Sequence, residues 1–365
     1  MDTSDFGPLL DRAHREIDAG LLPACQLAVA RNGEIELFET LGDATESTRF
    51  VVYSATKAFV AGAMWILIGE GAVDIGKPVS EYIPEFATNG KDVVTVEQVM
   101  LHTSGFPHAP LGPPAWWTRD GRVEQFASWK LNWEPGSAYE YHPTSAHWVL
   151  VEIIDRVTGT DYRDYIEQRV SRPAGLDRRV LGIAEDDQED IATVVSVGEQ
   201  AGPEELEAAF GIRELPVGEV TPEALLMFNQ PRVRSLGVPG GGGVMRATDL
   251  AIYYQALLHN EAGVWKPDVL ADATQSVRNN LPDRWTRIPA NRALGVIVSG
   301  TDGHLRGFGK TQSPRTFGHN GAGGQIAWAD PESGISFAYL TNGLDEHVLR
   351  QARRGVALSS IAATT

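Results

Sequence analysis

The stretch "RFVVYSATKAFVAGAMWILIGEGAVD", residues 49–74, holds an almost continuous apolar run that is interrupted by Lys57, three residues after Ser54. Because residues three apart on a helix share a face, the Lys57 amine can reach the Ser54 hydroxyl. A serine hydroxyl is a weak nucleophile at neutral pH and needs a neighbouring base. A lysine can be that base when apolar surroundings lower its pKa. The stretch therefore suggests a nucleophile and its base on one helix.

The same spacing has a second interpretation, in which Ser54 caps the helix and Lys57 extends its amine to water. A Ser-x-x-Lys match arises roughly once by chance in a chain this long, so the spacing alone does not decide. The chemical interpretation is favoured by the apolar setting of the cation, since residues 58–61 read Ala-Phe-Val-Ala.

Composition bounds the kind of protein. The chain has 365 residues, 42% of them hydrophobic, which is enough for a sizeable core in two domains or in one fold with a large insertion. A net charge of −17 argues against nucleic acid or an anionic membrane as partner. The single cysteine, Cys25, lies in an apolar run that predicts a core strand, and it excludes an internal disulfide.

Targeting features lead to an expected location. The N-terminus is acidic and amphipathic and does not resemble a signal peptide, and the longest apolar stretch, around residues 59–68, is too short to span a bilayer. We therefore expect a soluble cytoplasmic protein without a membrane partner.

Strand patterns cluster at the two ends of the chain. After a helical pattern at residues 7–19, two alternating segments flank Asn32-Gly33, a dipeptide that predicts a β-hairpin. A second hairpin is predicted around residues 331–334, and residues 292–300 predict another strand. A final helix is expected over residues 345–362.

The middle of the chain predicts helices with readable starts. Thr95 and Gln98 form a capping-box pattern, Thr144 begins a helix that ends at Gly159, and Thr248-Asp249 precedes another helix. We therefore predict an α/β fold, an α+β sandwich whose antiparallel sheet is built from both termini and flanked by helices. The sheet-containing domain would comprise residues 1–70 and 285–365, and residues 71–284 would form a mostly helical inserted subdomain, with the active site between them.

Three ordered segments carry a family resemblance: "FVVYSATKAFVAGAM", "GAVDIGKPVSEYIPEF" and "VTVEQVMLHTSGFP". Together they resemble the serine β-lactamase and penicillin-binding-protein superfamily, most closely the β-lactamase-like (class C-related, family VIII) carboxylesterases. The similarity runs from about residue 5 to 360 and thins between 175 and 235. It implies the β-lactamase/transpeptidase fold and an acyl-enzyme on Ser54.

The resemblance maps a second motif, of Tyr-x-Asn type, onto "WEPGSAYEYHPTSAHWVL". It implies that Tyr141 is a phenolic base or proton shuttle working with Lys57; Tyr139 is a nearby competitor in a less suitable register. Pro143 stands where the family has asparagine, and proline has no side-chain amide to bind an acylamino group. His142 either supplies a replacement polar group for substrate or faces solvent.

A third motif, Lys-Thr-Gly or His-x-Gly in the family, maps onto "RTFGHNGAGGQIAWAD". The resemblance implies that His319 acts near Tyr141 and the substrate, that Asn320 and Gly321 contact substrate, and that the N–H groups of Ser54 and Ala322 form the oxyanion hole. A lysine at position 319 would pair with a substrate carboxylate. Histidine is mostly neutral near pH 7, so this departure favours uncharged esters.

Other candidates are weaker. Trp116, Trp117 and Trp133 surround the loops before Tyr141, either as a wall for the acyl or alcohol group or as ordinary packing. His102 is expected to be a framework histidine. The glycine run in "PGGGGVMRATDL" lacks the ending of a phosphate-binding loop and is expected to allow close packing beside the site. No metal or other cofactor is expected.

These observations predict a serine hydrolase that cleaves small or medium carboxylic esters, with Ser54, Lys57, Tyr141 and His319 as catalytic residues. The alternatives are a β-lactamase or D-amino-acid peptidase/amidase, or a biosynthetic acyltransferase with the same machinery. A more distant alternative is a catalytically inactive binding protein. The physiological ester and a homo-oligomeric state are left open.

Overall fold

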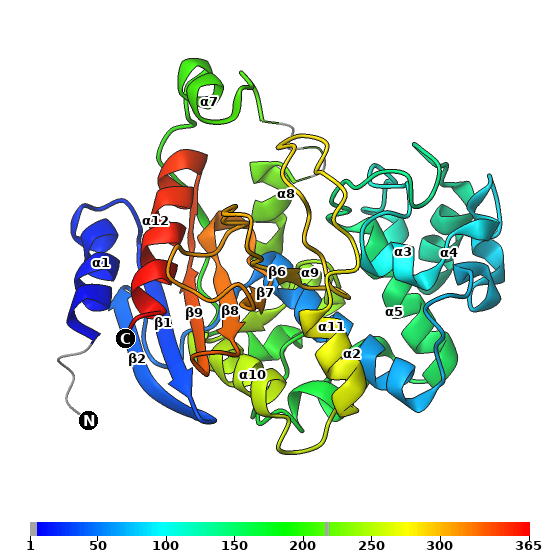
Figure 1. Ribbon diagram of the computed structural model, residues 1–365, viewed down its shortest axis with the longest axis horizontal. Coiled ribbons are helices and arrows are strands. Elements are labelled where there is room, and N and C mark those ends of the chain that lie inside the picture. The colour runs from blue at the N-terminus through cyan, green and yellow to red at the C-terminus, as the bar shows by residue number, and fades with distance from the viewer. Residues whose placement is uncertain (1–5, 216–217, 219) are drawn as a thin grey trace.

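A computed structural model describes residues 6–215, 218 and 220–365. Its centre is a six-stranded antiparallel sheet with the order β2-β1-β9-β8-β7-β6 (Figure 1). The strands are β1 Ala24–Arg31, β2 Glu34–Gly42, β6 Ile297–Val298, β7 Phe317–Gly318, β8 Ile326–Asp330 and β9 Ile335–Thr341. Segments from the two ends of the chain therefore pair in one sheet, as the sequence predicted.

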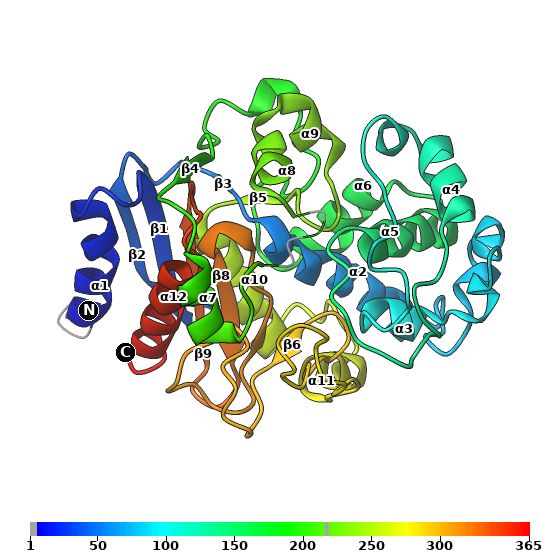
Figure 2. The same cartoon turned by 90° about the horizontal axis from the view of Figure 1, so that it is seen from above.

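Helices cover both faces of this sheet and extend away from it (Figures 1 and 2). They are α1 Gly7–Asp18, α2 Lys57–Glu70, α3 Val96–Met100, α4 Arg119–Ser128, α5 Ser145–Thr158, α6 Tyr162–Ile166, α7 Pro203–Phe210, α8 Pro222–Leu226, α9 Pro231–Leu236, α10 Ala247–His259, α11 Pro267–Gln275 and α12 Val348–Ala362. Two further short strand pairs lie outside the main sheet: β3 Phe50–Val51 with β5 Val244–Met245, and β4 Val195–Val197 with β10 Gly343–Asp345.

Successive side chains along each strand point to opposite faces of the sheet, and the two faces carry different kinds of residue. Large residues pack with α1 and α12, and alanines face the side on which α10 crosses the sheet, where their small size lets the helix lie close. The first set includes Leu27, Val29, Trp328, Phe337 and Tyr339, and the second includes Ala28, Ala30, Ala327, Ala329 and Ala338.

Several of the predicted turns and caps are confirmed. Asn32 and Gly33 have φ angles of 54° and 80°, as a tight hairpin between β1 and β2 requires. The Thr95 capping box forms both of its hydrogen bonds, and α5 ends at Gly159 in the left-handed region. Cys25 is buried in β1, as expected.

Three predicted boundaries are wrong. Residues 292–300 do not form one strand: the chain turns at Gly295, which has a φ of 92°, and only β6 remains. α12 starts at Val348 because residues up to Asp345 belong to β10. α10 starts earlier than expected, because Asp249 accepts the N–H of Arg246 and thereby makes Arg246 the cap.

The long apolar helix α2 passes through the middle of the molecule, between the sheet side and the helices α3 to α6 (Figures 1 and 2). Nearly all of its residues are buried. In the described part of the chain, no helix combines the length and apolar character needed to cross a membrane. The predicted division at residues 71 and 285 stays a prediction; α10, within that middle segment, packs on the sheet.

Candidate active site

Ser54 lies in a 3₁₀ turn, Tyr53–Thr56, that leads directly into α2. Tyr53 has a φ of 46°, a left-handed conformation that is unusual for a bulky side chain and needs support from its surroundings. The glycine run supplies that support. The Thr56 hydroxyl donates to the Tyr53 carbonyl at 2.6 Å and accepts the N–H of Gly243 at 2.8 Å. The glycine run thus packs beside Ser54, as the sequence predicted.

Lys57 is fully buried, so the interpretation in which its amine extends to water is wrong. Its Nζ lies 3.2 Å from the Ser54 hydroxyl, donates to the Pro143 carbonyl at 2.8 Å and also donates to the Gly240 carbonyl. Burial lowers its pKa well below the ordinary 10.5, and the nearby Arg292 guanidinium lowers the pKa further. In its neutral form, which burial favours, the amine keeps two N–H groups for the two carbonyls and has a lone pair that can accept the Ser54 proton.

Tyr141 lies beside this pair. The centre of its ring is 5.1 Å from Lys57 Nζ and 5.8 Å from the centre of the His319 ring. Its phenolic oxygen is buried and, within the described chain, forms no hydrogen bond of normal geometry. Burial raises the pKa of the Tyr141 phenol, an effect that Arg292 and the neighbouring Ser54 hydroxyl oppose. The phenol is therefore protonated at neutral pH and free to exchange its proton.

Tyr139, the competing tyrosine, is held elsewhere. Its hydroxyl accepts a hydrogen bond from Arg292 Nε at 3.1 Å, and its residue lines neither of the two cavities that contain Ser54. The geometry therefore favours the register that assigns the phenolic role to Tyr141.

His319, Asn320 and Gly321 follow β7 at the edge of the site. His319 Nδ1 bonds to the Asn320 carbonyl, and its buried Nε2 has no hydrogen-bond partner among the described residues. Burial, with Arg292 and Lys57 nearby, lowers the His319 pKa well below 6.5, so the ring is neutral at pH 7. The Asn320 side chain borders the cavity, but both ends of its amide are already hydrogen-bonded. Its Nδ2 donates to the Gly307 carbonyl, and its Oδ1 accepts the Ala327 N–H.

Two cavities meet at Ser54 and Ala322, so the two predicted oxyanion-hole residues lie together. The first cavity has a volume of about 290 Å³ and an apolar lining, and the second, of about 660 Å³, also contains Tyr141, His319 and Arg292. The apolar lining includes Tyr53, Pro110, Leu111, Trp116, Leu225, Met227, Phe228 and Val238.

The structure does not bring every predicted substrate-binding residue to these cavities. His142 is buried behind the site, where Nδ1 bonds to the Glu140 carbonyl and Nε2 accepts the Phe106 N–H at 3.2 Å. It does not face solvent and lines neither cavity. Trp117 and Trp133 stack against Arg232 and Arg284 and line neither cavity, whereas Trp116 lines the apolar one.

Sequence reasoning missed Arg292, which lines the larger cavity and is only 4% exposed. Its guanidinium carbon lies 5.2 Å from the centre of the Tyr141 ring. No local pattern indicates this placement, because Arg292 contacts Tyr141 from a segment far away in the sequence, which is held by backbone hydrogen bonds with Asn279.

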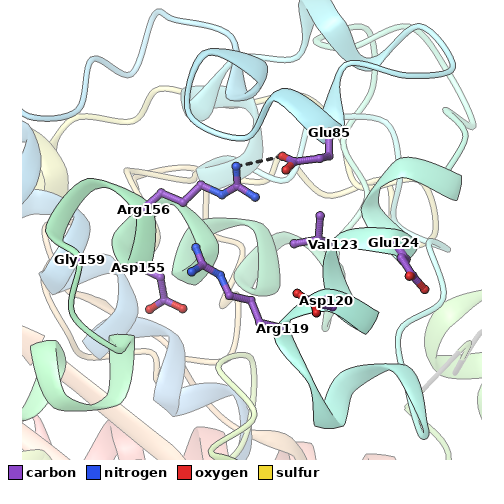
Figure 3. A pocket seen from close by; sticks show the side chains of 8 residues that line it. All are labelled: Glu85, Arg119, Asp120, Val123, Glu124, Asp155, Arg156 and Gly159. Carbon is purple, nitrogen blue, oxygen red and sulfur yellow. Dashed lines mark ion pairs between the residues drawn. The ribbon is translucent and has the colours of Figure 1, made fainter.

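A separate hollow of about 630 Å³ lies between α4 and α5 (Figure 3). Both of its arginines are already paired: Arg156 contacts Glu85 at 2.9 Å, and Arg119 contacts Glu152 at 2.8 Å. Its lining contains no nucleophile or base comparable to Ser54 and Lys57.

A family comparison agrees with this fold. The family model described as beta-lactamase matches residues 10–360. This chain belongs to the beta-lactamase family. Among curated proteins, it is 27% identical over 312 residues to "Esterase/beta-lactamase LipL" of Mycobacterium tuberculosis, covering 80% of this chain and 69% of that protein.

Solved structures are similar to this chain over nearly its whole length. A penicillin-binding-protein homolog from Caulobacter crescentus has a TM-score of 0.80 at 25% identity and covers 97% of this chain and 96% of its own. A family VIII carboxylesterase has a TM-score of 0.77 at 22% identity and covers 98% of this chain and 97% of its own. The fold is therefore the β-lactamase/transpeptidase fold.

Proposed function

We propose that this protein is a serine carboxylesterase that hydrolyses small or medium carboxylic esters through an acyl-enzyme on Ser54. The observation that carries the proposal is the buried Lys57 amine, 3.2 Å from the Ser54 hydroxyl. Its N–H groups are directed to the Pro143 and Gly240 carbonyls, which leaves its lone pair for the serine proton.

In the acylation step, Ser54 Oγ forms a bond to the ester carbonyl carbon as its proton passes to Lys57 Nζ. The N–H groups of Ser54 and Ala322 stabilise the oxyanion; such a donor contributes about 2.7–4 kcal/mol in another serine hydrolase. The ester C–O bond then breaks. The leaving oxygen takes a proton from Tyr141, which Lys57 reprotonates.

In the deacylation step, a water molecule attacks the acyl carbon, and its proton passes through Tyr141 to Lys57. His319, with a buried and unpartnered Nε2 in the described part of the structure, accepts a hydrogen bond from this water or from Tyr141. The bond from Ser54 Oγ to the acyl carbon breaks as Oγ regains a proton from Lys57. The acid then leaves and the site returns to its starting state.

Two features favour an ester over a lactam. Position 143 lies at the site, since its carbonyl accepts from Lys57, yet proline offers no amide for an acylamino group. The apolar cavity beside Ser54, of about 290 Å³, suits a small or medium acyl chain.

A second candidate is β-lactam hydrolysis, because the relative from M. tuberculosis is named for both esterase and beta-lactamase. Turnover of nitrocefin compared with para-nitrophenyl butanoate separates the two. We expect a much larger kcat/KM for the ester. A larger value for nitrocefin would make the β-lactamase function the correct one.

The direct test combines hydrolysis of para-nitrophenyl butanoate with labelling by a fluorophosphonate. We expect one label per chain, on Ser54, and loss of both labelling and hydrolysis in Ser54→Ala. Ser137→Ala, which changes an exposed serine hydroxyl, serves as the control and should behave as the wild type. Full labelling of Ser54→Ala would disprove the assignment of the nucleophile.

A further inference from the structure

Arg292 is a buried cation directed at the reactive end of the larger cavity. Its Nε donates to the Tyr139 hydroxyl, but its Nη1 is buried without a hydrogen-bond partner in the described part of the protein. The guanidinium lies beside the Tyr141 ring and shares the cavity with Ser54 and His319. A free guanidinium N–H in this position is available to a substrate.

Among the described residues Arg292 forms no ion pair with a carboxylate, whereas Arg119 and Arg350 each form one. Two carboxylates line the same cavity, but both are engaged. Glu140 pairs with His108 at 3.1 Å and with Arg284 at 3.6 Å. Asp283 accepts the N–H groups of Trp285 and Thr286 within its own turn.

The nearest titratable neighbours do not compensate the charge either. Lys57 and His319 are basic groups, and burial favours their neutral forms. A buried charge without a partner is costly, because it has lost its hydration and gained no counter-charge. An anion that enters the cavity would remove this cost, and a planar carboxylate matches the geometry of a guanidinium.

The position of Tyr141 decides which half of the substrate enters which cavity. In the proposed mechanism the leaving oxygen takes its proton from Tyr141, which lines the cavity of Arg292 but not the apolar cavity. The leaving alcohol therefore belongs in the cavity of Arg292. The acyl chain belongs in the apolar cavity, on the other side of Ser54.

We propose that Arg292 binds a carboxylate on the leaving alcohol, so that the preferred substrates are esters formed between an apolar acid and a hydroxy acid. This inference rests on the proposed esterase function and names its substrate class. It also revises the expectation of uncharged esters that followed from His319. A lysine at position 319 would pair with a substrate carboxylate, and in this protein the Arg292 guanidinium would do so instead.

The test compares two esters of equal shape, para-carboxyphenyl butanoate and para-carbamoylphenyl butanoate, which differ in charge. A charge-assisted hydrogen bond predicts that the wild type prefers the carboxylate ester in kcat/KM by about tenfold or more. Arg292→Gln should reduce this ratio to near one, and Arg292→Lys should keep part of it. Arg232→Gln is the control: it removes an exposed arginine that stacks on Trp117 outside both cavities, and it should keep the ratio.

A wild-type ratio near one would overturn the proposal. An unchanged ratio in Arg292→Gln would overturn it as well, and an equal loss on both esters would instead assign Arg292 to the proton transfer at Tyr141. If the wild type hydrolyses neither ester and resists fluorophosphonate, the esterase function fails.

The anion site is then tested separately, by calorimetric titration of the Ser54→Ala protein with para-hydroxybenzoate. Binding to Ser54→Ala that is lost in the double variant Ser54→Ala/Arg292→Gln supports the site. No binding to Ser54→Ala overturns it.

Discussion

The carbonyl oxygen of Val52 lies 2.2 Å from the point that a Cβ on residue 321 would occupy. Only glycine at position 321 allows this approach. It brings the segment after β7 against the turn that carries Ser54, and so brings Ala322 to the same cavities as Ser54. The proximity of the two predicted oxyanion-hole residues, Ser54 and Ala322, therefore depends on glycine at position 321.

Gly321→Ala should displace one of these segments. We expect a loss of about 1–3 kcal/mol in the free energy of unfolding, as for other overpacked sites, together with a fall in kcat. Urea unfolding and para-nitrophenyl butanoate turnover measure the two effects. Gly7→Ala, where a Cβ would meet no atom within 4 Å, is the control. Wild-type turnover in Gly321→Ala would show that the approach is dispensable.

Tyr141→Phe should separate stability from activity. The phenolic oxygen is buried with no hydrogen bond of normal geometry to the rest of the described chain, so its removal should not lower the free energy of unfolding. Loss of the proton carrier should reduce kcat by about 10²–10⁴-fold. Thermal melting and ester turnover are measured on the same preparation. Near-normal turnover would exclude Tyr141 from the mechanism.

Trp116→Ala should change acyl-chain preference, because Trp116 lines the apolar cavity. We expect the ratio of kcat/KM for butanoate over acetate esters to fall about tenfold, as lost apolar contacts affect the longer chain most. Trp117→Ala is the matched control, since Trp117 stacks on Arg232 outside the cavity. Equal ratios in the two variants would contradict the assignment of this cavity to the acyl chain.

Four buried histidines should make the fold sensitive to acid: His102, His142, His147 and His319. Burial lowers the pKa of each, for His142 to about 3. Below about pH 6.5 the unfolded chain binds protons that the folded chain excludes, so stability is present above this pH and falls as pH falls. The slope is roughly 1.4 kcal/mol per pH unit for each histidine that stays neutral.

Urea unfolding between pH 7.5 and 5 measures this slope. His147→Phe should reduce the slope by the contribution of one histidine, roughly 1.4 kcal/mol per pH unit. Neither ring nitrogen of His147 has a hydrogen-bond partner among the described residues, so the substitution breaks no such bond. A free energy of unfolding that does not change over this range would mean that the buried rings accept protons in the folded protein.

Local patterns were sufficient for much of the fold. Asn32-Gly33 predicts its hairpin because few other dipeptides adopt the two positive φ angles, and Thr95 predicts a helix start through bonds within four residues. Ser54 and Lys57 were recognisable because a helical turn alone brings them together.

Contacts between distant segments were not predictable in this way. The direction of His142 depends on the Phe106 N–H and the Ser104 hydroxyl, which belong to another loop. Arg292 contacts Tyr141 across a long separation in sequence, from a segment that turns at Gly295, where the alternation of residues had suggested a continuous strand. Both outcomes depend on tertiary packing, which overrides local preference.

In the proposed mechanism the neutral Lys57 amine takes the proton of Ser54. This proton transfer is tested most directly by the rate at which a fluorophosphonate labels Ser54, measured by intact-protein mass spectrometry as a function of pH. We expect a wild-type rate that rises with pH through an apparent pKa well below 10.5. In folded Lys57→Met we expect a rate at least about 100-fold lower, without this rise. Labelling of Lys57→Met at the wild-type rate would exclude Lys57 as the base.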